Sequence, residues 1–565
     1  MANHDVKRGG VPDPANSEPS VEIIQASEET SLLSSTPKKL DYEATEISTG
    51  DSSPSEDEAL EEATKPRSPL GIISLLLIGV LIANADGMLV LATYGTIASE
   101  FGALKDAAWL TTAFQLAGCA LQPIMGKLSD IYGRKHVLMI SYVFFAAGCV
   151  ICGIAQSMGQ VILGRVVSGF GAAGMTVLVS IIITDLVPLI EVASWRSFVN
   201  VVATLGRSAG GPLGGLLADT VGWRWSFTGQ GPLLTIAIIL VAFKLPSFAH
   251  DREEPIKGQP SKLRRVDFVG AVLLGSTIVS LLGALSLGGQ TFPWGHPLVI
   301  GLFVGSVILG VFFVLYELKY AFEPIFPPAL VIQRDVATSY LIQALQGAAQ
   351  VAMMYLVPLY FRATQFTSNT EAGAHLFPAV LGNTVGGLLS GYLIQRTGRY
   401  RLLAISALIA SSLSYFMLIV RWHGHTSWLE SLYIIPGGFG MGVVISCSMI
   451  SLVAGVKKQE IAVATGGLYL SSGIGTMIGI AGSSAVQMGT LRALLERRLS
   501  GFENSKEILE EAISNVGSIE GLEEGVRKVV VGCYVKSLEY SHMVSLGCTL
   551  LALLLAFTIR EHPLK

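Results

Sequence analysis

The chain has 565 residues, of which 14% are charged and 51% hydrophobic, and its formal net charge is −4 at pH 7. Because about a quarter of the residues of a soluble domain are charged, most of this chain is expected to lie in a lipid bilayer. No basic footprint for nucleic acid is present, and no phosphate loop, metal-ligand cluster or nucleophile–base pair indicates an enzyme or a cofactor. Cys149 and Cys152 lie in an unbroken apolar run, which favours packing over a redox or metal role.

Residues 1–69 are rich in Ser, Glu, Pro and Thr and poor in aromatic residues, a composition that predicts a disordered tail. The tail has no positively charged segment followed by an apolar core, so we do not expect a cleavable signal peptide, and the tail should stay in the cytosol. Glu28 followed by Leu32 and Leu33 has the spacing of an acidic dileucine signal that a sorting adaptor would bind, although so short a pattern also arises by chance.

Apolar windows of about twenty residues predict an all-α polytopic membrane protein with roughly fourteen helices. An even number of helices places both termini on one side of the membrane. The predicted helices are 70–92, 109–126, 137–156, 161–187, 195–217, 227–245, 268–288, 297–316, 337–361, 372–394, 402–420, 429–453, 461–488 and 541–559.

The distribution of Lys and Arg over the loops predicts the orientation. The loops near 157–160 and 289–297 contain neither residue, whereas four loops on the side of the N-terminus contain several. Because basic residues accumulate in cytosolic loops, we expect both termini in the cytosol. The basic residues of these four loops are Lys127, Arg134 and Lys135; Arg252, Lys257, Lys262, Arg264 and Arg265; Arg396, Arg399 and Arg401; and Lys457 and Lys458.

An internal repeat divides the predicted membrane part. The segment GKLSDIYGRKHVL at 126–138 is matched by GYLIQRTGRYRLL at 391–403, which indicates two related halves. The second copy lies two helices later than six helices per half would place it, so an inserted pair is expected. The expected parts are a six-helix bundle at 70–245, a linker and inserted pair at 246–320, and a second bundle at 321–565 whose loop near 490–540 forms a lumenal amphipathic cap.

The segment 126–138 combines small and charged residues at specific spacing. Gly126 and Gly133 are expected to permit tight turning, while Asp130 at the end of the second helix can form a charged latch with Arg134 and Lys135. The alternative is that the basic residues only anchor the topology. Asp185, at the end of the fourth helix, is expected either to dock against Arg134 or to be a solvated helix end.

This segment resembles the signature cytosolic loop of the major facilitator superfamily. Two further stretches support the resemblance: LGRVVSGFG around Arg165 is similar to the arginine motif of the fourth helix, and GRSAGGPLGG is similar to the fifth-helix motif of proton-coupled antiporters. With GWRWSF at 222–227, they point to the fourteen-helix drug:proton antiporter branch. The residues of the fifth-helix motif are Gly206, Gly210, Gly211, Pro212 and Gly215.

Asp86 lies inside the first predicted helix, where an isolated carboxylate is costly unless it faces a cavity, takes up a proton or finds a cation. A solvated position at the outer end of the helix is the alternative. The resemblance implies that Asp86 takes part in proton coupling and cation recognition, and that Arg165 helps to set the protonation of Asp86. If the resemblance is set aside, Arg165 could instead extend to the membrane boundary.

Arg207 departs from the resembled motif, which commonly has a glycine at this place. Four roles are open for Arg207: it could neutralise Asp86, repel a cationic substrate, set a different specificity, or pair with a carbonyl or carboxylate for structural reasons. The segment Glu191–Arg196, after the fourth predicted helix, also departs from the resembled family, whose members tend to have an acidic–basic turn there. Neutral polar residues inside predicted helices could line a cavity or hydrogen-bond neighbouring helices: Asn84, Gln115, Gln346, Gln350 and Asn383.

With the dileucine pattern, the fourteen-helix pattern resembles fungal vacuolar basic amino acid transporters. The resemblance implies a monomer that binds a small cationic substrate and protons and moves Lys, Arg and His into the vacuole by alternating access. A plasma-membrane multidrug:proton antiporter is the alternative, followed by a siderophore importer. A non-transporting nutrient receptor belongs to another class, and it would have no need to keep Asp86 or Arg165.

Overall fold

The computed structural model describes residues 69–103, 106–245, 262–289, 291–500, 502, 505–514 and 516–564, which belong to one unit of the chain, Pro66–Lys565. Residues 1–68 of the predicted tail, with Glu28, Leu32 and Leu33, lie outside the described residues, as do Arg252 and Lys257. The described part is helical, and its one β-bridge joins Gly288 to Phe292.

The helices before the inserted pair begin close to the predicted positions, and several continue further. The sixth is interrupted at Gly229, so that it consists of two pieces. Their bounds are α2 Pro69–Glu100, α3 Trp109–Tyr132, α4 Arg134–Ile154, α5 Met158–Leu186, α6 Leu189–Thr220, α7 Arg224–Thr228 and α8 Gln230–Lys244.

The rest of the chain forms the inserted pair and the second half. The inserted pair is α9 Phe268–Leu287 and α10 Pro297–Lys319, preceded by the short 3-10 helix η3 Lys262–Arg265. The second half contains α11 Pro328–Ile332, α12 Arg334–Gln365, α13 Asn369–Ala374, α14 Phe377–Thr397, α15 Arg401–Arg421, η4 Trp428–Ile434, α16 Ile435–Gly455, η5 Lys458–Glu460, α17 Ile461–Leu499, α18 Ser505–Ser514, η6 Val516–Gly521 and α19 Glu524–Ala556.

Twelve helical segments of the described chain are long and apolar enough to cross a membrane. Helices α3, with 24 residues, and α6, with 32 residues, are not in this set. Both are long enough to span a membrane, and both pack against helices that belong to the set. Counted together, they give the fourteen helices predicted from the sequence. The prediction of an all-α polytopic membrane protein is therefore confirmed.

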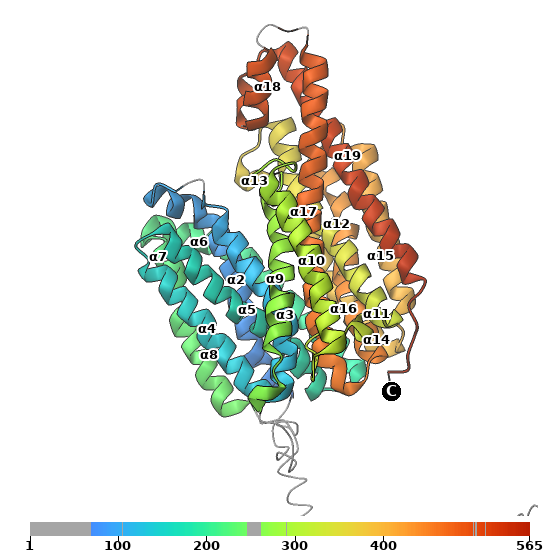
Figure 1. Ribbon diagram of the computed structural model, residues 1–565. Helices are drawn as coiled ribbons and strands as arrows, with labels where there is room; N and C mark the ends of the chain where they lie inside the picture. The colour runs from blue at the N-terminus through green and yellow to red at the C-terminus, as the bar shows by residue number, and fades with distance from the viewer. Residues whose placement is uncertain are drawn as a thin grey trace, which may run out of the picture. The chain divides into compact units, whose positions relative to one another are not determined.

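The helices pack mainly within two groups (Figure 1). In the first half, α2 packs along α6, and α5 lies between α3 and α4. In the second half, α12 packs against α17 and α19, and α14 packs against α16. The two groups meet where α3 contacts α17 and where α6 contacts α14.

The inserted pair attaches to this assembly through one face of α9. Leu274, Ile278 and Leu282 recur every four residues and are buried, forming one apolar cluster with Leu116 and Ile124 of α3. Helix α10 packs on α9, and Val307, Ile308, Val311 and Phe312 remain exposed, as expected for a face in contact with lipid.

The segment 490–540 differs from the predicted layout, because α17 continues to Leu499 and the last helix begins at Glu524 instead of residue 541. The apolar windows missed these turns, since Arg527, Lys528 and Lys536 lower the mean hydropathy there. The helices persist because one side of each is apolar: Leu495 of α17 and Val530 of α19 belong to one buried cluster, which also contains Leu509 of α18. The prediction of a long amphipathic loop near 490–540 therefore missed two helical extensions, of α17 and of α19.

Candidate functional site

Asp86 is the centre of a buried polar cluster in the first half. It lies 17 residues after the start of α2, about 26 Å along the helix axis at 1.5 Å per residue. Its carboxylate is fully buried and accepts a hydrogen bond at 2.7 Å from the Arg165 guanidinium of α5 and one at 3.0 Å from the Gln230 amide of α8. The alternatives of a solvated Asp86 and of an Arg165 extended to the boundary do not describe this structure.

Arg165 has partners besides Asp86. Its Nε donates to the Leu110 carbonyl oxygen at 3.0 Å, and the guanidinium lies 4.2 Å from the ring centroid of Phe114. Both partners belong to α3, so Arg165 joins α2, α3 and α5. Loss of the charge on Asp86 would weaken the polar contact of α2 with Arg165, while the contacts of Arg165 with α3 do not depend on that charge.

The position of α2 depends on glycines that recur every fourth residue along α6. A Cβ at Gly206 would lie 2.6 Å from the Leu81 carbonyl oxygen, and one at Gly214 would lie 2.8 Å from that of Leu89. A Cβ at Gly210 would lie 2.8 Å from the Met88 Cβ. Such close approach between membrane helices requires glycine.

The remaining motif residues have other positions. No atom lies within 4 Å of a Cβ built at Gly211 or Gly215, so these glycines are not needed for the α2 contact. Pro212 lies inside α6. The stretch GRSAGGPLGG therefore contains three contact glycines, Gly206, Gly210 and Gly214, of which Gly214 was not among the residues selected from the sequence.

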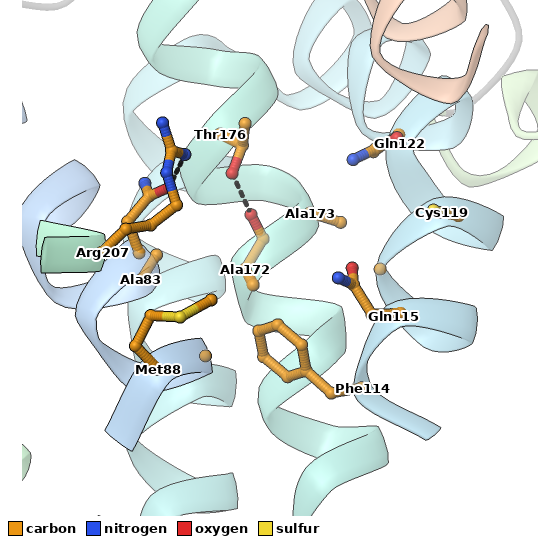
Figure 2. Close-up of a pocket in the computed structure, with 13 residues that line it drawn as sticks. Ala83, Met88, Phe114, Gln115, Cys119, Gln122, Ala172, Ala173, Thr176 and Arg207 are labelled. Atoms are coloured by element: carbon orange, nitrogen blue, oxygen red, sulfur yellow. Dashed lines mark hydrogen bonds between the residues drawn. The ribbon is translucent and has the colours of Figure 1, made fainter. Parts of the chain in front are cut away.

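A cavity of about 230 Å³ lies on the other side of α2 from Asp86. Figure 2 shows Met88 and Arg207 on one side of it and Gln115 and Gln122 of α3 on the opposite side. Residues of α2, α3, α5 and α6 line the cavity: Ala83, Asn84, Gly87, Met88, Phe114, Gln115, Gly118, Cys119, Gln122, Ala172, Ala173, Thr176 and Arg207.

Arg207 and Asn84 form the polar wall of this cavity. The Arg207 guanidinium donates to Asn84 Oδ1 at 2.7 Å and to Thr204 Oγ1 at 3.3 Å. Two residues along a helix correspond to a rotation of about 200°, so Asn84 and Asp86 project to opposite sides of α2. Arg207 therefore does not neutralise Asp86 in this arrangement.

The other cavity candidates separate into two groups. Gln115 lines the cavity together with Asn84. Gln346, Gln350 and Asn383 are not among its lining residues: Gln346 donates to Ser411 Oγ at 3.0 Å, and Asn383 accepts from Asn200 at 2.7 Å. These two contacts join helices, which was the alternative role considered for such residues.

The charged latch of segment 126–138 lies within the first half. Arg134 donates to Ser129 at 2.6 Å, to Asp185 at 3.1 Å and to Asp130, so it joins the adjoining ends of α3, α4 and α5. Lys135 instead donates to the Ala242 carbonyl oxygen of α8 at 2.6 Å. The structure thus places Asp185 against the basic loop and Lys135 outside the latch.

The two glycines of this segment serve different purposes. Gly133 has φ +93°, a conformation that glycine adopts without strain, so it permits the turn between α3 and α4. Gly126 is helical, and a Cβ there would lie 2.8 Å from the Ala462 carbonyl carbon of α17. The prediction that Gly126 serves tight turning is wrong, because its position is one of close helix contact.

Contacts between the two halves gather at the end of the helices that carries segment 126–138, called here the 126–138 end. Ser194 of α6 donates to the Gly391 carbonyl oxygen and to Gln395, both at 3.0 Å, and Ser197 donates to the Gly387 carbonyl oxygen. These contacts and Gly126 against α17 close this end.

Arg196 is a contact residue to which the sequence assigned no partner. It is buried on α6, donates to Ser180 of α5 and Tyr469 of α17, and lies 5.5 Å from the Tyr469 ring centroid. It lies inside α6, within the segment that departs from the resembled family. Its partners could not be found by a pattern search, since they are far away in the sequence.

Glu323 joins the inserted pair to segment 126–138. Its carboxylate lies 2.9 Å from Lys127 and 2.7 Å from Arg265. Burial raises the pKa of the Glu323 carboxyl, but hydrogen bonds from Arg265 and Lys127 outweigh this effect and hold the pKa below its ordinary value. The stabilisation is therefore present above the ordinary pKa of a glutamate and is lost as the pH falls through the lowered value.

The described fold consists of two helical halves, and the buried Asp86–Arg165 pair lies inside the first half. The model of the Major Facilitator Superfamily matches residues 76–480, which is more than half of the chain. The chain belongs to the major facilitator superfamily, whose members are transporters and not enzymes.

Among its relatives are fungal vacuolar transporters. The chain is 30% identical over 490 residues to the vacuolar membrane amino acid uptake transporter fnx2 of Schizosaccharomyces pombe, covering 86% of this chain and 84% of that one. It is 30% identical over 455 residues to vacuolar basic amino acid transporter 2 of Saccharomyces cerevisiae, covering 79% of this chain and 96% of that one.

A third relative has a different description. Multidrug resistance protein fnx1 of Schizosaccharomyces pombe is 31% identical over 475 residues, covering 83% of this chain and 88% of that one. Among solved structures, the human organic anion transporter MFSD10 superposes with a TM-score of 0.55 at 15% identity, covering 87% of this chain and 100% of that one. At this identity the superposition supports the fold alone.

Proposed function

We propose that this chain is a proton-coupled antiporter that moves basic amino acids such as Lys, Arg and His into the vacuole by alternating access. The observation that carries the proposal is the fully buried ion pair of Asp86 and Arg165. A carboxylate at this depth is a natural site for a transported proton, since protonation removes a charge that is costly inside a membrane. The vacuolar amino acid transporters among the relatives support the substrate class.

The coupling between proton and substrate runs through α2. Protonation of Asp86 weakens its contacts with Arg165 and Gln230, so the polar link from α2 to α5 and α8 becomes weaker. The same helix carries Asn84, which faces the cavity and holds Arg207. A movement of α2 therefore changes the cavity when the proton binds.

The direction of transport follows from the orientation that we infer from the basic loops. With the 126–138 end in the cytosol, the arrangement closed at this end separates the cavity from the cytosol, and a proton from the acidic lumen reaches Asp86 once a movement of α2 exposes this buried carboxylate. Proton movement out of the vacuole then drives substrate in. The latch at Arg134 and the contacts of Gly126 and Gly391 maintain this arrangement.

The test is ATP-dependent uptake of labelled lysine, arginine and histidine by isolated vacuoles, with and without a protonophore. We expect wild-type uptake that the protonophore abolishes, and no uptake above background for Asp86→Asn, which cannot exchange a proton. The matched control is Asp219→Asn, because Asp219 is an exposed aspartate near the end of α6.

The amount of each protein in the vacuolar membrane must be measured, so that loss of the protein is separated from loss of transport. Equal uptake by wild type and Asp86→Asn at equal amounts would reject the role of Asp86. Uptake that resists the protonophore would reject proton coupling.

The second candidate is a multidrug:proton antiporter of the plasma membrane, favoured by the similarity to multidrug resistance protein fnx1. Such an antiporter would use the same fold and the same ion pair, so its location and its substrate distinguish it from a vacuolar amino acid antiporter. A tagged chain at the cell surface, with drug resistance that depends on Asp86 and no vacuolar uptake of amino acids, would favour this candidate. A nutrient receptor would transport nothing and would respond to amino acids without a proton gradient.

A further inference from the structure

Arg207 is a charged residue in the cavity for which the described part of the chain provides no carboxylate. Its two hydrogen bonds go to the neutral side chains of Asn84 and Thr204. A guanidinium has five N–H donors, so most of its donors are left for another acceptor. Arg207 lies more than halfway along the membrane helix α6, but its side chain is exposed. It is one of the residues that line the cavity.

Holding the Arg207 charge without a carboxylate partner inside a membrane protein costs free energy, which indicates that a ligand pairs with it. A cation inside a membrane protein is usually paired, as Arg165 is with Asp86. Asp86 cannot serve both arginines, because it is fully buried between α5 and α8 and is absent from the cavity lining. Arg207 is thus placed for an anion that enters the cavity.

The opposite wall has a complementary character. Gln115 and Gln122 of α3 face Arg207 across the cavity in Figure 2. The Gln122 amide oxygen is buried and has no hydrogen-bond partner in the structure, and Figure 2 shows the amide nitrogen on the cavity side. Rotation of the amide about the last side-chain bond turns this oxygen toward the cavity. An amide oxygen without a donor can accept a hydrogen bond from an ammonium group, and the described lining holds no carboxylate that would do so instead.

We propose that the cavity is a binding site for a substrate with a carboxylate group, which Arg207 binds while the amide of Gln122 accepts from an amino group of the same molecule. A guanidinium matches a carboxylate through two parallel hydrogen bonds, which a lysine cannot reproduce. This inference rests on the proposed transport of amino acids and deepens it, because it assigns recognition to the α-carboxylate.

The test compares amino acids with amines that lack the carboxylate. Purified protein is heated with lysine or cadaverine, arginine or agmatine, and histidine or histamine, and the shift of the unfolding temperature is followed against ligand concentration. Lysine methyl ester, which keeps both amino groups and loses the negative charge, is a further probe. We expect wild type to bind each amino acid roughly tenfold or more tightly than its amine, equivalent to about 1.4 kcal/mol.

Three variants distinguish recognition from stability. Arg207→Gln should bind amino acid and amine equally weakly, and Arg207→Lys should recover part of the preference, since it retains charge without the paired donors. The control Arg497→Gln removes an exposed arginine at the end of α17, away from the cavity, and should behave as wild type. A vacuolar uptake assay with the same competitors should give the same order.

The outcomes separate this inference from the proposed function. If wild type binds and transports lysine but prefers it to cadaverine no more than Arg207→Gln does, the carboxylate inference is wrong and basic amino acid transport stands. If wild type binds only neutral amino acids or other carboxylates, and does so through Arg207, the inference stands and the proposed substrate is wrong. If no carboxylate-bearing probe is bound, both are rejected.

Discussion

Two arginines deep in the first half have contrasting surroundings. Arg165 is almost fully buried and is paired with Asp86, a carbonyl oxygen and an aromatic ring. Arg207 faces a cavity and touches only neutral side chains among the described residues. Because Asn84 and Asp86 lie on opposite sides of α2, one helix connects the two environments. In the mechanism that we propose, this connection couples a proton at Asp86 to a ligand at Arg207.

At this scale, the Asp86–Arg165 pair predicts a non-additive effect on stability. Asp86→Asn leaves Arg165 charged and buried, and breaking such a pair costs about 3–5 kcal/mol. Arg165→Gln should cost less, since Asp86 can then take up a proton. The double variant should be more stable than Asp86→Asn alone, as measured by the apparent unfolding temperature of purified protein. Additive losses would show that the two side chains do not depend on each other.

Among the elements, α6 has the most varied role. Its glycines Gly206, Gly210 and Gly214 allow contact with α2, while its first turns hold Arg196 and Ser197 against the second half. Arg207, next to Gly206, belongs to the cavity wall. A change in how α6 packs should therefore alter the cavity and the contact between halves together.

The packing of α6 on α2 is tested by adding one methyl group at neighbouring positions. Gly210→Ala places a Cβ against Ala85 and Met88, and such overpacking typically costs about 1–3 kcal/mol. Gly211→Ala meets no atom within 4 Å and serves as the matched control. We expect a lowered unfolding temperature and reduced uptake for Gly210→Ala only. Equal behaviour of the two variants would contradict the close contact with α2.

On the scale of the described unit, the two halves meet through equivalent contacts. Gly126 of α3 lies against the start of α17, and Gly391 of α14 lies against Ser194 near the start of α6. Both glycines open the repeated segments, at 126–138 and 391–403. The charged latch is not repeated: Arg134 bridges Asp130 and Asp185, whereas no ion pair of Arg399 is found in the part of the chain that the structure describes. Among the described residues, the latch is found in the first half.

These contacts predict how the closed 126–138 end can be opened. Gly126→Ala would push α3 away from α17, and the arrangement closed at this end should become less populated. Ser197→Cys, in a background without the native cysteines, reports the opening of this end, because Ser197 is buried where α6 meets α14. A hydrophilic maleimide should label it faster in the Gly126→Ala variant than in the Gly95→Ala control, whose added Cβ meets nothing within 4 Å. Unchanged labelling would show that Gly126 does not support closure.

The sequence was sufficient for the fold class, the family and about fourteen helices, because apolar runs and short motifs are local signals. It also singled out Asp86, Arg165 and Arg134, since charges stand out in apolar surroundings. It could not show the partners of Arg196 or Gln230, or which side of α2 Asp86 faces, because these depend on how helices distant in the sequence pack together. The same limit explains Gly126: the motif predicted a turn, whereas the folded chain uses this glycine for contact with α17.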